Sequence, residues 1–288
     1  MVNTSCSGIV SIGGNDAQPV LCGANQPLVV ICGPCVIEGR NHLLAEAEKI
    51  VEICKRLELP LIFKSSYDKA NRTSLAGYRG IGIEAGLEAL AEVRLKFHVP
   101  VITDVHSPEE ASLASRFVDM LQVPAFLCRQ TDLLQAVARQ NLPILVKKGQ
   151  FLPPEDMKYV VQKISECGNN AVIACERGSC FGYRDLVVDY RSLEILKGLG
   201  LNTIFDATHS VQVMGGAHGA SSGNRRFVPA LARAAVAVGV QGVFLEAHSN
   251  PDTAPSDGPN MIPIGELEVL LNDLKMLSEL QLNTRCGI

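Results

Sequence analysis

Eight short runs of apolar and β-branched residues recur along the chain, and each is apolar almost throughout instead of alternating with polar residues. A strand that is apolar on both faces is typical of a parallel sheet covered on both sides. Parallel neighbours need a crossover connection, usually a helix, so the pattern requires helices between the runs. The predicted strands are residues 27–33, 60–66, 99–106, 118–124, 142–148, 170–178, 202–210 and 242–248.

The segments between these strands carry helical patterns. Ser107 is a candidate N-cap, Pro108 occupies the first helical position, and two acidic residues follow in the first turn. A similar start and a glycine stop delimit the helix that we expect at 153–168. Helices are predicted over residues 41–57, 107–117, 153–168, 228–239 and 264–280.

Eight strand–helix units predict an α/β fold of the (β/α)8 TIM-barrel type. A doubly wound sheet is the alternative, but no predicted strand is followed by the G-x-G-x-x-G turn of the dinucleotide-binding version. We expect one domain over residues 1–288. Residues 1–25 form an N-terminal extension whose β-hairpin (8–23) caps the bottom of the barrel, and residues 26–288 form the barrel.

The composition narrows the classes of function. Hydrophobic residues make up 47% of the chain and charged residues 19%, so the chain can bury a large core. A net charge of −4, 5% aromatic residues and the absence of Trp argue against nucleic-acid binding. We find neither a secretory signal nor an apolar run of membrane-spanning length. The expectation is a cytoplasmic protein that binds no membrane and keeps its cysteines reduced.

The carboxyl ends of the predicted strands are polar, and these ends carry the functional groups in a TIM barrel. Cations occur at three of them and in the adjoining loops. In an acidic protein this clustering predicts an anion pocket, with phosphate as the expected anion, because Arg and Lys are its usual ligands. The cations are Lys64, Lys69, Arg72, Arg129, Lys147, Lys148 and Arg177, and the sequence does not separate the roles of Lys147 and Lys148.

The stretch Cys32-Gly-Pro-Cys35 has three interpretations. A thiol–disulfide exchanger carries such a motif in a small βαβ domain, usually after an aromatic residue, whereas Ile31 precedes it in this much longer chain. Two core cysteines that are close by coincidence are the second interpretation. The third is that Cys35 binds a metal ion.

The predicted topology favours the metal interpretation. The first, seventh and eighth strands are neighbours in a closed barrel, so Cys35, His209 and Glu246 lie on one side of its mouth. Asp257 follows in the loop after the eighth strand. One thiolate, one imidazole and two carboxylates suit Fe²⁺, Mn²⁺ or Zn²⁺. We therefore predict a divalent metal site formed by Cys35, His209, Glu246 and Asp257.

Six longer motifs cover nearly the whole chain beyond residue 25: FKSSYDKANRTS (63–74), LQVPAFLCRQTDLL (121–134), VKKGQF (146–151), ERGSCFGYRDLVVD (176–189), FDATHSVQ (205–212) and GVFLEAHSNPDTAPSDGP (242–259). Together they resemble the 3-deoxy-D-manno-octulosonate 8-phosphate synthases. DKANRTS separates this family from the 3-deoxy-D-arabino-heptulosonate 7-phosphate synthases. The resemblance implies a homotetrameric transferase of lipopolysaccharide precursor synthesis. Such an enzyme condenses phosphoenolpyruvate with D-arabinose 5-phosphate and water and releases phosphate.

The resemblance also implies roles for individual residues. Those implied to hold phosphoenolpyruvate are Lys64, Lys147 and Arg177, with Gln122 and Arg129 beside them. Those implied to meet arabinose 5-phosphate are Lys69, Asn71, Arg72 and Thr73, with His209 and Gln212 between the two substrates. The candidate catalytic residues are Lys64, Asp104, His209 and Glu246, and the sequence does not decide which of them moves protons.

The family has metal-dependent members with Cys in the "GPC" motif and metal-independent members with Asn there. Cys35 places this chain with the metal-dependent group. Two features depart from that group's usual pattern. The motif SDGP (256–259) resembles the metal-independent version, and Asn224 stands where a second Gly is common. A sugar-phosphate-binding barrel without turnover would keep the same cations, and measuring phosphate release distinguishes it from the enzyme.

Overall fold

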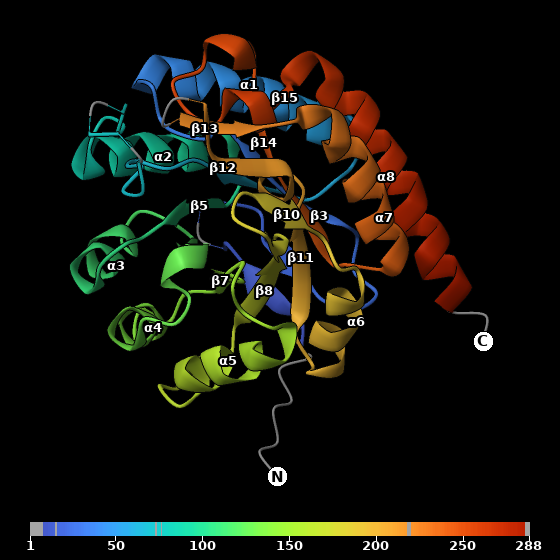
Figure 1. Cartoon of the computed structure of the whole chain (residues 1–288). Coiled ribbons are helices and arrows are strands. Elements are labelled where there is room, and N and C mark those ends of the chain that lie inside the picture. Colours follow the sequence, from blue (N-terminus) through green and yellow to red (C-terminus); the bar gives the residue numbers. More distant parts are fainter. Residues whose placement is uncertain (1–7, 15, 73, 76, 218–219, 286–288) are drawn as a thin grey trace.

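The computed structural model describes residues 8–14, 16–72, 74–75, 77–217 and 220–285. Eight parallel strands form a closed barrel, in which the last strand pairs with both the first and the seventh. This arrangement confirms the predicted (β/α)8 barrel (Figure 1). The barrel strands in chain order are β3 (Val29–Gly33), β4 (Leu61–Lys64), β5 (Val101–Asp104), β6 (Met120–Val123), β7 (Ile144–Lys147), β8 (Val172–Glu176), β11 (Asn202–Asp206) and β14 (Gly242–His248).

Helices surround the barrel on its outer side (Figure 1). Ser107 caps one of them as predicted, because its hydroxyl accepts a bond from the Glu110 amide at 3.2 Å. The predicted helix at 153–168 is divided into a 3-10 turn, η2 (Pro154–Asp156), and the α-helix that follows it. The helices are α1 (Arg40–Arg56), α2 (Ile83–Phe97), α3 (Pro108–Ala114), α4 (Thr131–Ala138), α5 (Met157–Ser165), α6 (Arg191–Gly198), α7 (Val228–Val238) and α8 (Ile264–Arg285). None of the described helices is long and apolar enough to cross a membrane.

The side chains of each barrel strand alternate between two apolar layers. One layer lies between the strands and the helices and includes Val30, Cys32 and Phe63. The other fills the barrel interior and takes its members from all eight strands, among them Ile31 and Phe244. Because the side chains alternate, only those in line with the interior layer reach the mouth of the barrel from the upper end of a strand.

The N-terminal hairpin closes the lower end of this interior. Its strands β1 (Val10–Ile12) and β2 (Val20–Cys22) are antiparallel, and their buried side chains belong to the interior layer. Asn202, the first residue of β11, donates its amide to the Gly8 carbonyl at 2.9 Å. The hairpin therefore caps the bottom of the barrel, as predicted.

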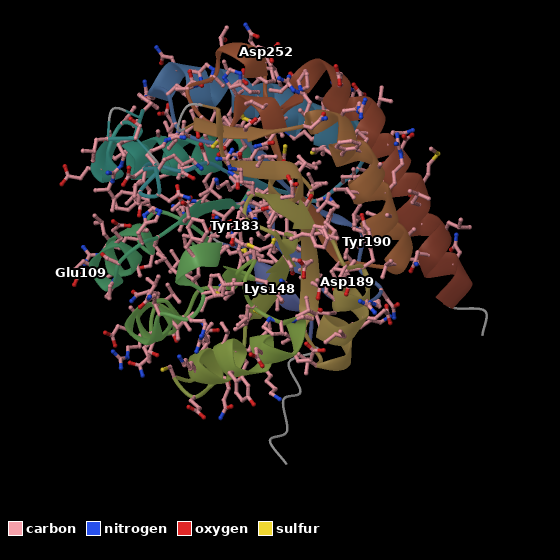
Figure 2. All side chains as sticks on the ribbon, in the orientation of Figure 1. Glu109, Lys148, Tyr183, Asp189, Tyr190 and Asp252 are labelled. Atoms are coloured by element: carbon pink, nitrogen blue, oxygen red, sulfur yellow. The ribbon has the colours of Figure 1, made fainter. Side chains whose placement is uncertain are left out.

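Shorter elements follow the upper ends of the strands. Tyr183, in the turn between β9 and β10, is fully exposed (Figure 2). The short strands are β9 (Ser179–Phe181), β10 (Asp185–Val187), β12 (Gln212–Ala217), β13 (Ala220–Gly223) and β15 (Ile262–Pro263). The short 3-10 turns are η1 (Ala125–Leu127), η3 (His209–Val211), η4 (Arg225–Phe227), η5 (Pro251–Thr253) and η6 (Gly258–Asn260).

Candidate active site

A cavity of about 560 Å³ opens at the carboxyl ends of the barrel strands. Its position agrees with the rule that TIM-barrel sites are built from the loops at this end. Most of the residues predicted from the sequence meet here, although they come from strands and loops spread over the whole chain. The predicted residues that line the cavity are Lys64, Lys69, Asn71, Arg72, Asp104, Gln122, Lys147, Arg177, His209, Gln212 and Asp257.

The alternation along each strand explains which polar residues face the cavity. Lys147 follows Leu145 by two positions, and Leu145 points into the barrel interior, so Lys147 rises above it. Lys148 has the opposite orientation and donates to the Leu152 carbonyl at 3.1 Å and the Ser179 hydroxyl at 3.2 Å. The structure therefore separates the two lysines that the sequence could not.

Three further predicted residues are not among the described residues that line the cavity. Cys35 and Glu246 are buried next to it, with 1% and 0% of their surface exposed. Arg129 is exposed behind η1 and is not among the described residues that line the cavity. Thr73 lies outside the described residues.

Cys35 lies beside two carboxylates. Its sulfur and one oxygen each of Glu246 and Asp257 all lie within 4.8 Å of one another. The thiol donates to Asp257 Oδ2 at 3.2 Å, and the Ser256 hydroxyl lies 2.9 Å from the sulfur. Burial raises the pKa of the Cys35 thiol well above its usual value, and the charge of Glu246 raises it further. Lys69 and Lys64 lower the pKa of Cys35 by less than burial and Glu246 raise it, so the thiol keeps its proton.

Glu246 has an unsatisfied oxygen in this group. Its Oε2 is buried without a hydrogen-bond partner among the described residues, and His209 Nε2 lies 3.6 Å away. A buried carboxylate oxygen without a donor is costly unless a cation lies against it. The thiol of Cys35 and the carboxylates of Glu246 and Asp257 therefore form a group that could hold a metal ion, and His209, predicted as a fourth ligand, lies beside Glu246 but outside this group.

His209 is oriented by a carboxylate from its own loop. Its Nδ1 lies 2.8 Å from Asp206 Oδ2, and Asp206 also accepts a hydrogen bond from Lys147. Burial alone would raise the pKa of Asp206, but the charges of His209 and Lys147 hold it well below its usual value. Asp206 at Nδ1 leaves Nε2 directed at Glu246, an arrangement common behind metal-binding histidines.

The Cys32-Gly-Pro-Cys35 motif is not a dithiol pair directed at one site. Cys32 faces the layer between barrel and helices, where burial raises the pKa of its thiol well above the usual value. Gly33 between them allows close strand contact, since a Cβ there would lie 2.0 Å from the Lys64 carbonyl oxygen. Cys32 is a core residue, and this excludes the thiol–disulfide interpretation.

Two buried lysines share one serine hydroxyl beneath the cavity. Lys64 and Lys69 donate to Ser66 Oγ at 2.8 and 3.1 Å, and this hydroxyl donates to Asp104. Lys64 also lies 3.3 Å from Glu246 Oε1. Burial would lower the pKa of Lys69, but the surrounding negative groups raise it above its usual value. Two positive charges are thus fixed at this side of the site.

Arg177 and Gln212 form the opposite side. Arg177 Nη2 donates to Gln212 Oε1 at 2.9 Å, and Gln212 Nε2 donates to Asp257 Oδ1 at 3.3 Å. The second guanidinium nitrogen of Arg177, Nη1, and Gln122 Oε1 are buried without hydrogen-bond partners among the described residues. Unsatisfied buried groups in a cavity indicate the contacts that a ligand would make.

His106 lines the cavity and was not among the predicted site residues. Its Nε2 lies 3.2 Å from Asp104 Oδ2 and its Nδ1 lies 2.9 Å from Glu110 Oε2. Burial would lower the pKa of His106, but the two carboxylates raise it to about 9. Burial alone would raise the pKa of Asp104, but Lys64 and His106 hold it well below its usual value. The Asp104-x-His106 spacing at a strand end was the signal available in the sequence.

This imidazolium makes stability depend on pH. A pKa raised from 6.5 to about 9 stabilises the fold fully below pH 6.5, and the contribution is lost as pH rises through 9. We expect the difference in unfolding free energy between wild type and His106→Asn to shrink by about 3 kcal/mol between those limits. Denaturant unfolding at a series of pH values measures it, with exposed His98→Asn as the control. A difference that stays constant with pH for His106→Asn contradicts the assignment.

Comparison with known proteins agrees with this geometry. A model of the DAHP synthetase I family matches residues 10–283. The 2-dehydro-3-deoxyphosphooctonate aldolase of Magnetococcus marinus is 54% identical over 90% of this chain and 90% of its own length. The aldolases of the same name from Rhizobium meliloti and Rickettsia bellii are 52% and 53% identical, over 91% and 90% of this chain and 93% and 94% of their own lengths. The chain therefore belongs to the DAHP synthetase I family and, within it, to the 2-dehydro-3-deoxyphosphooctonate aldolases, which are the 3-deoxy-D-manno-octulosonate 8-phosphate synthases predicted from the motifs.

Proposed function

We propose that the chain condenses phosphoenolpyruvate with D-arabinose 5-phosphate and water, giving 3-deoxy-D-manno-octulosonate 8-phosphate and phosphate for lipopolysaccharide synthesis. The observation that carries the proposal is one cavity lined by five cationic side chains, from Lys64, Lys69, Arg72, Lys147 and Arg177. Two multiply charged anions must lie side by side in this reaction. Fixed cations offset their repulsion and hold the reacting carbons together.

We assign phosphoenolpyruvate to the side of Lys64, Lys147 and Arg177. Arg177 offers a buried, unsatisfied guanidinium nitrogen, and Lys147 is held at this place by Asp206. Gln122 lines the cavity beside these residues. Carbon 3 of the bound enol attacks the aldehyde carbon while water adds to carbon 2, and phosphate leaves with cleavage of the carbon–oxygen bond. No phosphoryl-transfer base is needed for this step.

We assign arabinose 5-phosphate to the loop after β4, with Lys69, Asn71 and Arg72 lining the cavity and Thr73 in the same motif. Arg72 Nε donates to the Tyr78 carbonyl at 2.9 Å, which fixes the guanidinium at the rim. Its Nη2 also donates to the Pro255 carbonyl at 3.5 Å, and the further N–H groups of its two terminal nitrogens can bind a phosphate in the bidentate manner that suits Arg. The aldehyde end of the sugar then lies toward phosphoenolpyruvate, with His209 and Gln212 between them.

The matching prediction concerns Arg72. Arg72→Ala should raise the KM for arabinose 5-phosphate about ten- to hundredfold, because a charged hydrogen bond contributes about 1.5–3 kcal/mol. The KM for phosphoenolpyruvate should change little. Arg72→Lys should also be impaired, since Lys cannot replace a bidentate contact. Steady-state kinetics measure both constants, with Arg79→Ala as the control, since exposed Arg79 pairs with Asp68. Equal losses for both substrates contradict the assignment.

We assign the divalent metal to Cys35, Glu246 and Asp257, with His209 as the fourth ligand. The buried, unsatisfied Glu246 oxygen supports this set. When bound there, Fe²⁺, Mn²⁺ or Zn²⁺ supplies Lewis-acid polarisation of the aldehyde oxygen or activation of the water. The chain's own contribution is to keep Glu246 ionised, since Lys64 and Lys69 lie beside it at 3.3 and 3.9 Å.

Lys64, Asp104, His209 and Glu246 are the proposed catalytic residues. Asp104 is ionised beneath the cavity, and its Oδ2 lies 3.2 Å from Nε2 of the protonated His106 ring. This pair can exchange a proton with a bound hydroxyl or water. Lys64 offsets charge that develops on the substrates.

The proposal includes a homotetramer in the cytoplasm. Exposed apolar side chains near the cavity support assembly, since Phe126, Phe151 and Phe181 are 48%, 54% and 71% exposed. Light scattering of the purified protein measures the number of subunits, and a monomer contradicts this part of the proposal.

Phosphate release tests the reaction itself. We expect release from phosphoenolpyruvate only when arabinose 5-phosphate is also present, and mass spectrometry should find the eight-carbon product. Erythrose 4-phosphate is the control substrate, because the DAHP synthetase I family is named for the seven-carbon product. Binding of both substrates without turnover favours the non-catalytic sugar-phosphate-binding barrel, and a preference for erythrose 4-phosphate contradicts the substrate assignment.

A further inference from the structure

Two stretches of chain carry three of the proposed metal ligands. Cys35 lies in the connection from β3 to α1, whereas Glu246 lies in β14 and Asp257 in the loop after it. Cys35 and Asp257 are 222 residues apart in sequence, yet their side chains touch. The relative position of the two stretches therefore sets the geometry of the metal site.

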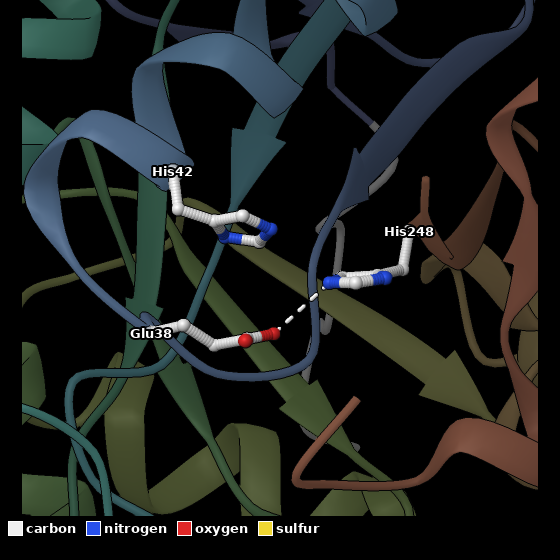
Figure 3. A group of neighbouring side chains, drawn as sticks. All are labelled: Glu38, His42 and His248. Carbon is white, nitrogen blue, oxygen red and sulfur yellow. Dashed lines mark hydrogen bonds and ion pairs between the residues drawn. The ribbon is translucent and has the colours of Figure 1, made fainter. Parts of the chain in front are cut away.

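Glu38 joins these stretches at one point (Figure 3). His248, the last residue of β14, has its Nε2 2.9 Å from Glu38 Oε1. Its Nδ1 accepts the backbone N–H of Asn250 at 2.9 Å. A ring nitrogen that accepts a backbone N–H carries no proton, so the proton of His248 is on Nε2 and is donated to Glu38.

The same contact argues that this group does not bind metal, although donor atoms of Glu38, His42 and His248 lie within 4.8 Å of one another. A metal-bound histidine donates its other ring N–H to a carboxylate or carbonyl. In His248 that other nitrogen faces the N–H of Asn250, so metal on Nε2 would require this bond to break. The group links two segments of the chain.

Glu46, on α1, joins the stretches at a second point. It is 1% exposed, and its Oε2 accepts the Ser249 backbone N–H at 2.7 Å. Its Oε1 accepts the Ser249 hydroxyl and lies 3.3 Å from Lys49 Nζ. Burial would raise the pKa of Glu46, but these bonds hold it below its usual value. Residues 248–250 are thus held by two carboxylates from the stretch that begins at Cys35.

We propose that Glu38 and Glu46 are positioning residues of the metal site. They fix residues 248–250, which lie between Glu246 and Asp257, against the chain that follows Cys35. Neither residue is among the described residues that line the substrate cavity. Their loss should loosen the approach of Asp257 to Cys35 and weaken metal binding. This inference rests on the proposed metal site.

The experiment measures Zn²⁺ affinity of metal-free protein by competition with a chromophoric chelator. We expect Glu38→Ala and Glu46→Gln each to weaken Zn²⁺ binding about 10- to 100-fold, the usual effect of losing a group behind a ligand. With saturating Zn²⁺, kcat should stay near the wild-type value. Glu268→Gln is the control, because Glu268 on α8 pairs at 2.8 Å with exposed Arg56 of α1, the helix that carries Glu46. The Tm of this metal-free control shows how much stability the lost surface ion pair contributes. Its Zn²⁺ affinity then shows whether a loss of stability alone weakens metal binding.

Three results decide the matter. Unchanged Zn²⁺ affinity in both variants, with normal binding by wild type, overturns the inference and leaves the metal site standing. Wild type that binds no Zn²⁺ overturns the metal site and the inference together. A second equivalent of Zn²⁺ that disappears in His42→Ala overturns the structural reading of the Glu38 group. If the carboxylate variants do not fold, Ser249→Ala removes one donor to Glu46, and an unchanged affinity there counts equally against the inference.

Discussion

Lys147→Met should lower kcat/KM by about a thousandfold, the scale of losing one fixed positive group at developing charge. Lys147 is 5% exposed, hydrogen-bonded to Asp206 and directed into the cavity. Its removal leaves a buried Asp206 charge where a substrate anion must bind. Steady-state kinetics with both substrates measure the loss.

Lys148→Met is the matched control for this prediction. Lys148 is as deeply buried as its neighbour but lies 3.6 Å from Glu176 on the opposite side of the strand. Breaking this buried pair should destabilise the fold by roughly 3 kcal/mol and leave kcat/KM within a few-fold of wild type. Similar losses of activity in both variants would contradict the orientation of β7 described here.

Cys35→Ala should lose bound metal and at least about a hundredfold in turnover, because a direct ligand matters more than the groups behind it. The barrel should stay folded, since its apolar layers do not depend on Cys35. Metal content by elemental analysis and kcat measure the two effects. Cys35→Asn should retain some metal-free activity, because the loop at Asp257 already reads SDGP.

Cys32→Ala is the control for the cysteine prediction. Cys32 is buried in the layer beneath the helices, so its loss should cost stability and leave metal binding and turnover intact. Loss of activity in Cys32→Ala with normal activity in Cys35→Ala would contradict the roles given to the two thiols.

The barrel was predictable because its strands are buried on both faces and so read as unbroken apolar runs. Because both faces of such a strand are apolar, the sequence pattern does not show which side chains point into the barrel. Lys147 and Lys148 both follow such a run, and only the interior position of Leu145 shows which of them faces the cavity. Glu176 and Arg177 pose the same ambiguity, and Arg177 reaches the cavity because Cys175 points into the barrel.

The ligand group was predictable as far as strand order determines it. Cys35 and Glu246 follow neighbouring strands, so a closed barrel brings them together. The position of the Asp257 side chain depends on the conformation of its loop, where the Asp257 backbone is left-handed with φ of 51°. Strand patterns in the sequence do not encode this geometry. Arg129, which the family resemblance implies beside phosphoenolpyruvate, stays a prediction, since it is exposed at the end of η1.

The central claim is a metal-dependent condensation at one cationic cavity, and phosphate release by chelated protein tests it most directly. Protein stripped of metal is mixed with phosphoenolpyruvate and arabinose 5-phosphate, with and without added Mn²⁺, Fe²⁺ or Zn²⁺. We expect release to require both substrates and a divalent ion, and the three ions to restore activity to different degrees. Full activity after exhaustive chelation, with no bound metal by elemental analysis, would contradict the metal site, and no release under any of these conditions would contradict the condensation.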